Sequence, residues 1–111
     1  MVNPRWAAAG LALVFPLLVS APAHADPDID FANQLHSFGI YGARDYNAWI
    51  GKIACKRLDR DVDADAYASA TFIGRNLPRD STPAQAFQFL GAAVSTYCPD
   101  QAHVLQNAAH A

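Results

Sequence analysis

Two cysteines, Cys55 and Cys98, are the residues of this 111-residue chain whose chemistry is most distinctive. In an exported chain, a lone pair of cysteines favours one disulfide bond, because compartments outside the cytoplasm are oxidising. Such a bond would close a long loop and would stabilise the fold by on the order of 4 kcal/mol in the chain-entropy account. The alternative is a pair of free thiols.

The histidines give little support for a metal or catalytic site. Beyond residue 25 the sequence has only His36, His103 and His110, and none stands in a His-x-x-x-His or Cys-x-x-Cys spacing typical of zinc sites. A serine hydrolase needs a base held beside a nucleophile, and nothing in the sequence indicates that the hydroxyl of Ser37, Ser69 or Ser95 is held beside the His36 ring. We therefore expect no metal and no catalytic residues, and a cell-envelope hydrolase is the weaker alternative.

The acidic residues are all aspartates, and four of them alternate from Asp59 to Asp65. A calcium-binding loop would require a glycine at its sharp turn and a bidentate glutamate at its end, and neither is present. We interpret this stretch as a solvated turn in which Asp61 or Asp63 caps the following helix. The aspartates lie in capping or loop positions, so they do not indicate the facing carboxylates of a glycosidase.

Aromatic side chains could serve as ligands, as core or as contact surface. The types that can ligate haem iron are present at Tyr41, Tyr46, Tyr67, Tyr97 and His36. Aromatics at helical spacing usually fill a core, and a small domain leaves little room for a ligand site of roughly 300 Å³ or more. We expect no cofactor, and a carrier of an apolar or haem-like ligand is an alternative.

Trp49 and Tyr41 are candidate surface anchors, because tryptophan and tyrosine dominate the hot spots of binding surfaces. For each of them the alternative is a place in the hydrophobic core.

Residues 1–25 have the layout of a cleavable signal peptide. Arg5 precedes an apolar run over residues 7–19, and small residues then stand at the two positions read by a signal peptidase. Cleavage is expected between Ala25 and Asp26. The run is shorter than the about 20 residues of a membrane-spanning helix, although an uncleaved anchor is the alternative. We expect export by the general secretion route to the envelope or beyond, with no stable membrane insertion after cleavage.

The elements that would position these residues are helices. Apolar residues recur at helical spacing and predict four helices, over residues 28–38, 46–58 and 64–76 and from Pro83 until Pro99 interrupts the last. Sustained alternation and Asn-Gly or Asp-Gly turns are missing, which argues against strands. The predicted class is all-α, a four-helix domain over residues 26–99 with an interhelical Cys55–Cys98 bond. Residues 100–111 are expected to be a tail that is partly helical or frayed.

Local signals mark several helix ends. Thr82, Pro83 and Gln85 form the pattern of a capping box with proline at the first helical position. Gly39 is expected to stop the first helix, with Ile40 folding back on its last turn, and Asp45 is the expected cap of the second. Gly51 falls inside the second helix at a cost of about 1 kcal/mol, which a close crossing by another helix would explain.

Three segments stand out in their order along the chain: Phe31 to Ile40, Ile50 to Cys55 with its Gly-Lys-x-x-Cys pattern, and Phe89 to Pro99 with its closing Tyr-Cys-Pro. Together they resemble a family of small exported mycobacterial proteins catalogued as domain of unknown function 732. The resemblance covers about residues 28–99. It implies a signal peptide, a short helical domain and a cysteine pair, and it implies no activity. The chain departs from the family pattern in the turn after Cys55, which has no glycine.

Charge and composition exclude some partners and favour a class of function. The formal net charge is −2 at neutral pH, so the chain carries no electrostatic footprint for nucleic acid. We expect a non-enzymatic interaction module whose partner is an unknown protein or another component of the envelope.

Overall fold

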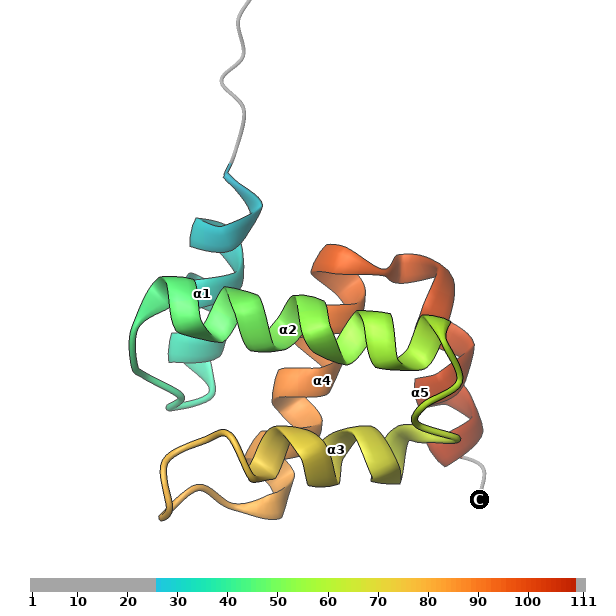
Figure 1. Cartoon of the computed structure of the whole chain (residues 1–111). Helices are drawn as coiled ribbons and strands as arrows, with labels where there is room; N and C mark the ends of the chain where they lie inside the picture. The colour runs from blue at the N-terminus through green and yellow to red at the C-terminus, as the bar shows by residue number, and fades with distance from the viewer. Residues whose placement is uncertain (1–25, 110–111) are drawn as a thin grey trace, which may run out of the picture.

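The computed structural model describes residues 26–109 as an all-α domain, in which no residue of that range is in a β-strand. Its helices are α1 (Pro27–Ser37), α2 (Arg44–Asp59), α3 (Ala66–Gly74), α4 (Pro83–Tyr97) and α5 (Ala102–Ala109), with a 3-10 turn, η3 (Pro99–Gln101), before the last (Figure 1). The predicted fold class is confirmed, and the predicted count of four helices is corrected to five for this range. The predicted signal peptide, residues 1–25, lies outside the described residues, which begin at Asp26.

Helix α4 is the element on which the other helices pack. Helices α1, α2 and α3 all contact it, and α2 crosses in front of it in Figure 1. The side chains of Phe89 and Leu90 are fully buried. The ring of Phe31 from α1 meets that of Phe89 edge to face, with centroids 5.2 Å apart, so α1 and α4 share the centre of the core.

The disulfide bond joins α2 to the residue that directly follows α4. Cys55 and Cys98 are bonded, their Cα atoms lie 5.8 Å apart, and both side chains are buried. The predicted interhelical bond is therefore present, and it closes a loop of 43 positions.

The capping box at the start of α4 is confirmed and also ties down α1. The Thr82 hydroxyl accepts a hydrogen bond from the backbone N–H of Gln85 at 3.1 Å, and the side-chain oxygen of Gln85 accepts one from the backbone N–H of Thr82 at 2.9 Å. The amide nitrogen of the same Gln85 side chain donates to the carbonyl of Phe38 at 3.2 Å. One residue thus fixes the start of α4 against the end of α1.

Helices α1 and α2 end in the same hydrogen-bonded motif. After α1, the amide of Ile40 donates to the carbonyl of Leu35, and Gly39 has a positive φ of 78°. This is the Schellman arrangement expected there. After α2, the amide of Val62 donates to the carbonyl of Arg57, and Asp61 takes the left-handed position with φ 56°. In this turn, where the family pattern has a glycine, the chain has an aspartate, a residue type that tolerates the left-handed conformation.

Two predicted caps are wrong. Helix α2 begins after Ala43, which offers no side-chain cap, and Asp45 lies inside the first turn beside Arg44. Helix α3 is capped by Asp65, which accepts from the Ala68 amide at 2.9 Å. Asp63 cannot serve as that cap because its carboxylate is already bonded to other side chains, as described below.

The segment after Pro99 is helical over Ala102–Ala109 and packs against the rest of the domain. Val104, Leu105 and Ala108 share one side of α5 and pack against the core. The Gln101 side chain donates to the Asp59 carboxylate at 2.7 Å, holding η3 to the end of α2. Within residues 26–109, no helix has the length and apolarity needed to cross a membrane.

Candidate functional site: the outward face of α2

Helix α2 has one buried face and one face that is largely exposed. The buried positions include Ile50, Ala54 and Leu58, which face α1, α3 and α4. On the opposite side, residues at helical spacing form a continuous stripe, which we call the α2 face; it consists of Tyr46, Trp49, Lys52, Ile53, Lys56 and Arg60. The stripe has an aromatic end at the start of the helix and a cationic end at its finish.

The aromatic end is a pair of exposed rings. Trp49 is 59% exposed and Tyr46 is 42% exposed. The ring centroids are 6.1 Å apart, and the planes are inclined at 61°. The Tyr46 hydroxyl donates to the carbonyl of Asn76 at 3.4 Å, which holds that ring against the end of α3. The core placement considered for Trp49 is therefore wrong, and its role as an anchor stays a prediction.

Tyr41, the other candidate anchor, lies in the loop between α1 and α2. It is 63% exposed, and its ring meets the His36 ring with centroids 5.1 Å apart. Over residues 26–109 the aromatic contacts of Tyr41 and Trp49 are with different partners, so the structure does not bring the two anchors together. The three-residue spacing of Tyr46 and Trp49 predicts that they share one stripe of the helix, but Tyr46 was not among the predicted anchors.

The cationic end of the stripe carries charge that is only partly neutralised. Lys52 forms an ion pair with Asp28 at 3.3 Å, and its ammonium group lies 5.3 Å from the centre of the Tyr97 ring. In the part of the chain that the structure describes, Lys56 and Arg60 form no ion pair. Both are exposed. They can therefore attract an anionic group from outside the domain.

A separate ionic cluster beside α2 is structural. The buried Asp63 carboxylate accepts two hydrogen bonds from the Arg57 guanidinium, at 2.8 and 2.9 Å, and one from the Ser69 hydroxyl at 3.0 Å. The Arg57 guanidinium also lies over the Phe72 ring at 4.2 Å. The hydrogen bonds to Asp63 raise the pKa of the Arg57 guanidinium. The turn expected to be solvated is thus partly buried.

The same contacts bear on the hydrolase alternative. Ser69 is fully buried and bonded to Asp63, and the Ser37 hydroxyl donates to the carbonyl of Gln34 at 2.6 Å. No hydrogen bond joins His36 to a serine among residues 26–109. Over the same range, no three side chains of histidine, cysteine, aspartate or glutamate are grouped in a way that could hold a metal ion.

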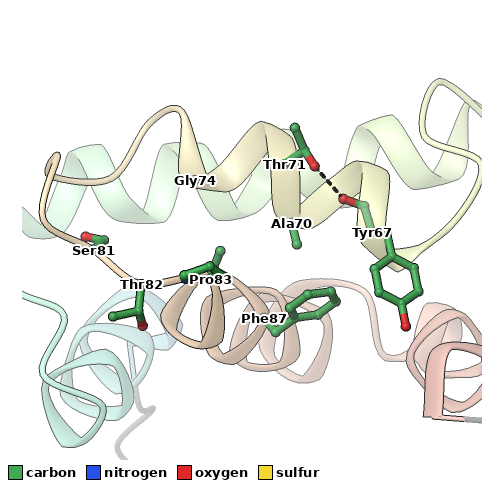
Figure 2. Close-up of a pocket in the computed structure, with 9 residues that line it drawn as sticks. Tyr67, Ala70, Thr71, Gly74, Ser81, Thr82, Pro83 and Phe87 are labelled. Carbon is green, nitrogen blue, oxygen red and sulfur yellow. Dashed lines mark hydrogen bonds between the residues drawn. The ribbon is translucent and has the colours of Figure 1, made fainter.

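Apart from the α2 face, the domain has an apolar groove of about 320 Å³ between α3 and α4 (Figure 2). Its lining includes the small residues Ala70, Gly74 and Ala86. Figure 2 shows Ala70 pointing from α3 toward α4, and the Tyr67 and Phe87 rings close one end with centroids 5.3 Å apart. The groove is near the lower limit of ligand pockets, roughly 300 Å³.

The groove offers apolar contact and little polar chemistry. The Thr71 hydroxyl donates to the carbonyl of Tyr67 at 2.9 Å, the bond drawn in Figure 2. The Thr82 hydroxyl accepts from the Gln85 amide, as part of the capping box. No charged side chain or histidine lines the groove, so its walls suit a small apolar group.

Fold and surface together define a small disulfide-bonded helical domain with exposed aromatic residues. The chain belongs to the family described as protein of unknown function DUF732, whose model matches residues 26–100. It is 62% identical over 91 residues to the uncharacterized protein Rv0559c of Mycobacterium tuberculosis strain H37Rv, covering 81% of each chain. The identity and coverage are the same for the uncharacterized protein MT0585 of strain CDC 1551 of that species. No solved structure matches the chain.

Proposed function

We propose that this protein is a non-enzymatic interaction module that binds another macromolecule through the α2 face, with Trp49 as its principal anchor. The observation that carries the proposal is the exposure of Trp49 and Tyr46 as a contacting pair on a helix whose other face is locked in the core. Burial of an exposed tryptophan at an interface supplies a large share of binding energy. The disulfide bond gives the helix a rigid base, which lowers the entropy lost on binding.

The proposal includes export, since the segment before Asp26 has the layout of a signal peptide and the domain carries a disulfide bond. The partner is then a component of the envelope or of the surroundings of the cell. Intact-mass analysis of the protein from culture filtrate and cell lysate tests this part. Export predicts a chain beginning at Asp26 in the filtrate, and a chain that retains residues 1–25 inside the cell would contradict it.

Site-specific photo-crosslinking tests the binding role. The photoreactive residue benzoylphenylalanine is placed at position 49, at position 41 or, as a control, at position 67 on α3, where Tyr67 is 52% exposed. In mycobacterial cells, position 49 is expected to give a discrete crosslinked product that excess wild-type protein removes and that excess Trp49→Ala protein leaves. Equal products at positions 49 and 67 would contradict a role for the α2 face. A hydrolytic turnover that His36→Ala abolishes, with the fold intact, would contradict a non-enzymatic function.

The groove between α3 and α4 favours a second candidate, a carrier of a small apolar ligand. Its volume of about 320 Å³ and its uncharged walls support this alternative. Its size does not favour a haem-like ligand. Native mass spectrometry of the protein from its own host tests the idea, because a retained ligand would add a fixed mass. Gly74→Leu fills the groove and should remove that mass, whereas Gly91→Leu on α4 should retain it.

A further inference from the structure

We propose that the α2 face recognises an acidic segment of a partner protein, with an apolar side chain seated on Trp49 and carboxylates paired with Lys56 and Arg60. This inference rests on the proposed function and specifies the chemistry of its partner. It follows from the order of side chains along one helix face.

The dimensions of the stripe suit a partner segment that runs along α2. At about 1.5 Å per residue, Trp49 and Arg60 are separated by roughly 16 Å along the axis. Lys52, Lys56 and Arg60 recur every four residues, which places successive cations about 6 Å apart. Lys52 is already paired with Asp28, so an acidic helix with two carboxylates four residues apart can match Lys56 and Arg60.

Charge complementarity sets the sign of the partner. Lys56 and Arg60 are exposed and form no ion pair within residues 26–109. Opposite charges across an interface accelerate association and exclude partners of the wrong sign. Ile53, half-buried between the two ends of the stripe, continues the apolar surface from Trp49 toward Lys56.

The shape of the charged area favours a peptide over an anionic membrane. The cations form a single row, and carboxylates stand beside it, with Asp28 paired to Lys52 and Asp59 bonded to Gln101. A lipid surface is planar and would meet those carboxylates too. Each basic residue near an anionic membrane adds only a small increment of binding, so two unpaired cations give weak adsorption. A single segment can instead follow the row without meeting the flanking carboxylates.

The test uses a synthetic alanine-based helical peptide with one leucine near one end and two glutamates, four residues apart, toward the other end. Its affinity for the disulfide-bonded protein is measured by titration calorimetry at low and at physiological salt. Wild-type protein should bind the peptide, and binding should weaken as salt is raised. The variant Lys56→Glu/Arg60→Glu should weaken it at least tenfold. The matched control Arg75→Glu/Arg79→Glu, which reverses two exposed cations outside the stripe, should leave it unchanged.

A charge swap separates recognition from damage to the fold. Lys56→Glu/Arg60→Glu should bind the same peptide with lysines in place of glutamates, a gain that a misfolded protein would not show. Failure of the wild type to bind the acidic peptide, or equal losses in both double variants, overturns the inference. Binding to phosphatidylglycerol vesicles instead, with the same dependence on Lys56 and Arg60, also overturns it and assigns the face to lipid. A crosslink at position 49 in either case would leave the proposed function standing without an acidic partner.

Discussion

The Tyr97 hydroxyl donates a hydrogen bond of 2.7 Å to the Asp28 carboxylate, and this contact joins the last residue of α4 to the first turn of α1. The two residues are 69 positions apart in the chain. The hydrogen bond from Tyr97, followed by the contacts with Lys52, lowers the pKa of Asp28 below its ordinary value of 3.8, against the opposing effect of burial. Burial and the neighbouring carboxylate of Asp28 raise the pKa of Tyr97.

Removing the Tyr97 hydroxyl should therefore destabilise the fold at neutral pH. We expect Tyr97→Phe to lower the free energy of unfolding by about 1 kcal/mol, because Asp28 keeps its contact with Lys52 and is partly solvated. Tyr46→Phe is the matched control, since that hydroxyl makes a longer hydrogen bond of 3.4 Å at the surface. Urea unfolding of the three proteins gives the comparison, and equal losses for the two variants would contradict it.

The same pair predicts the pH dependence of that difference. A carboxylate whose pKa is lowered on folding contributes stability above its unfolded pKa, and this is lost as the pH falls through the folded value. The effect of Tyr97→Phe should thus persist down to about the ordinary value of 3.8 and shrink below it. At the alkaline end the raised pKa of Tyr97 should make the wild type alone lose stability as the pH rises beyond about 10, where an unfolded tyrosine ionises. A difference that is constant from acid to alkaline pH would argue against both effects.

Gly51 allows the aromatic rings of α1 and α4 to approach α2. A Cβ atom at this position would lie 3.0 Å from Cζ of Phe31 and 3.2 Å from Cε2 of Tyr97. We expect Gly51→Ala to lower the free energy of unfolding by about 1–2 kcal/mol, because overpacking costs more than the helix propensity of alanine returns.

Gly91 provides the control for this substitution. It also lies inside a helix, α4, but no atom stands within 4 Å of a Cβ built there. Gly91→Ala should therefore raise the free energy of unfolding by roughly 0.5–1 kcal/mol. Thermal or urea unfolding of both variants tests the contrast, and stabilisation by Gly51→Ala would show that the rings move aside without cost.

Helix ends could be predicted from the sequence where a residue type strongly prefers one structural position. Gly39 predicted the end of α1, and Thr82 with Gln85 predicted the start of α4. Glycine is strongly preferred at the left-handed position after a helix, and the Thr-x-x-Gln pattern is typical of a capping box. Asp61 and Asp63 gave no comparable signal. An aspartate can cap a helix, occupy a left-handed turn or pair with an arginine, and only the tertiary contact with Arg57 selects among these roles.

The orientation of α2 shows the same limit at the candidate site. Trp49 and Ile50 are both apolar neighbours, yet Trp49 is 59% exposed and Ile50 is 3% exposed. The helical spacing of apolar residues is compatible with either Trp49 or Ile50 at the centre of the buried face. The choice depends on where Cys55, Ala54 and Leu58 meet α4, which is a property of the assembled domain. The sequence also did not predict that α5 packs on the domain. Val104 and Leu105 are stabilised by contact with the assembled core, which the local sequence does not show.

Asp61 gives a direct measure of the cost of the left-handed turn after α2. Only glycine, and to a lesser degree asparagine and aspartate, adopts this conformation readily. We expect Asp61→Gly to be more stable than Asp61→Ala by about 1 kcal/mol, since the φ of 56° strains an alanine. Asp80→Gly and Asp80→Ala serve as the reference pair, because Asp80 is exposed and its φ is not positive. Equal stabilities for the two Asp61 variants would show that the turn relaxes to another conformation.

The disulfide bond should account for a large part of the stability of the domain. It links residues separated by 43 positions, and a loop of that size corresponds to about 4 kcal/mol in the chain-entropy account. We expect the variant Cys55→Ala/Cys98→Ala to melt lower than the oxidised wild type by roughly 15–30 °C, the shift typical of that free energy in a domain of this size. Reduction of the wild type should give a similar decrease, and the double variant should be insensitive to the reductant. Because Cys98 directly precedes η3 and α5, hydrogen exchange in the reduced protein should rise first in Ala102–Ala109. An unchanged melting temperature after complete reduction would mean that helix packing alone holds α2 against α4.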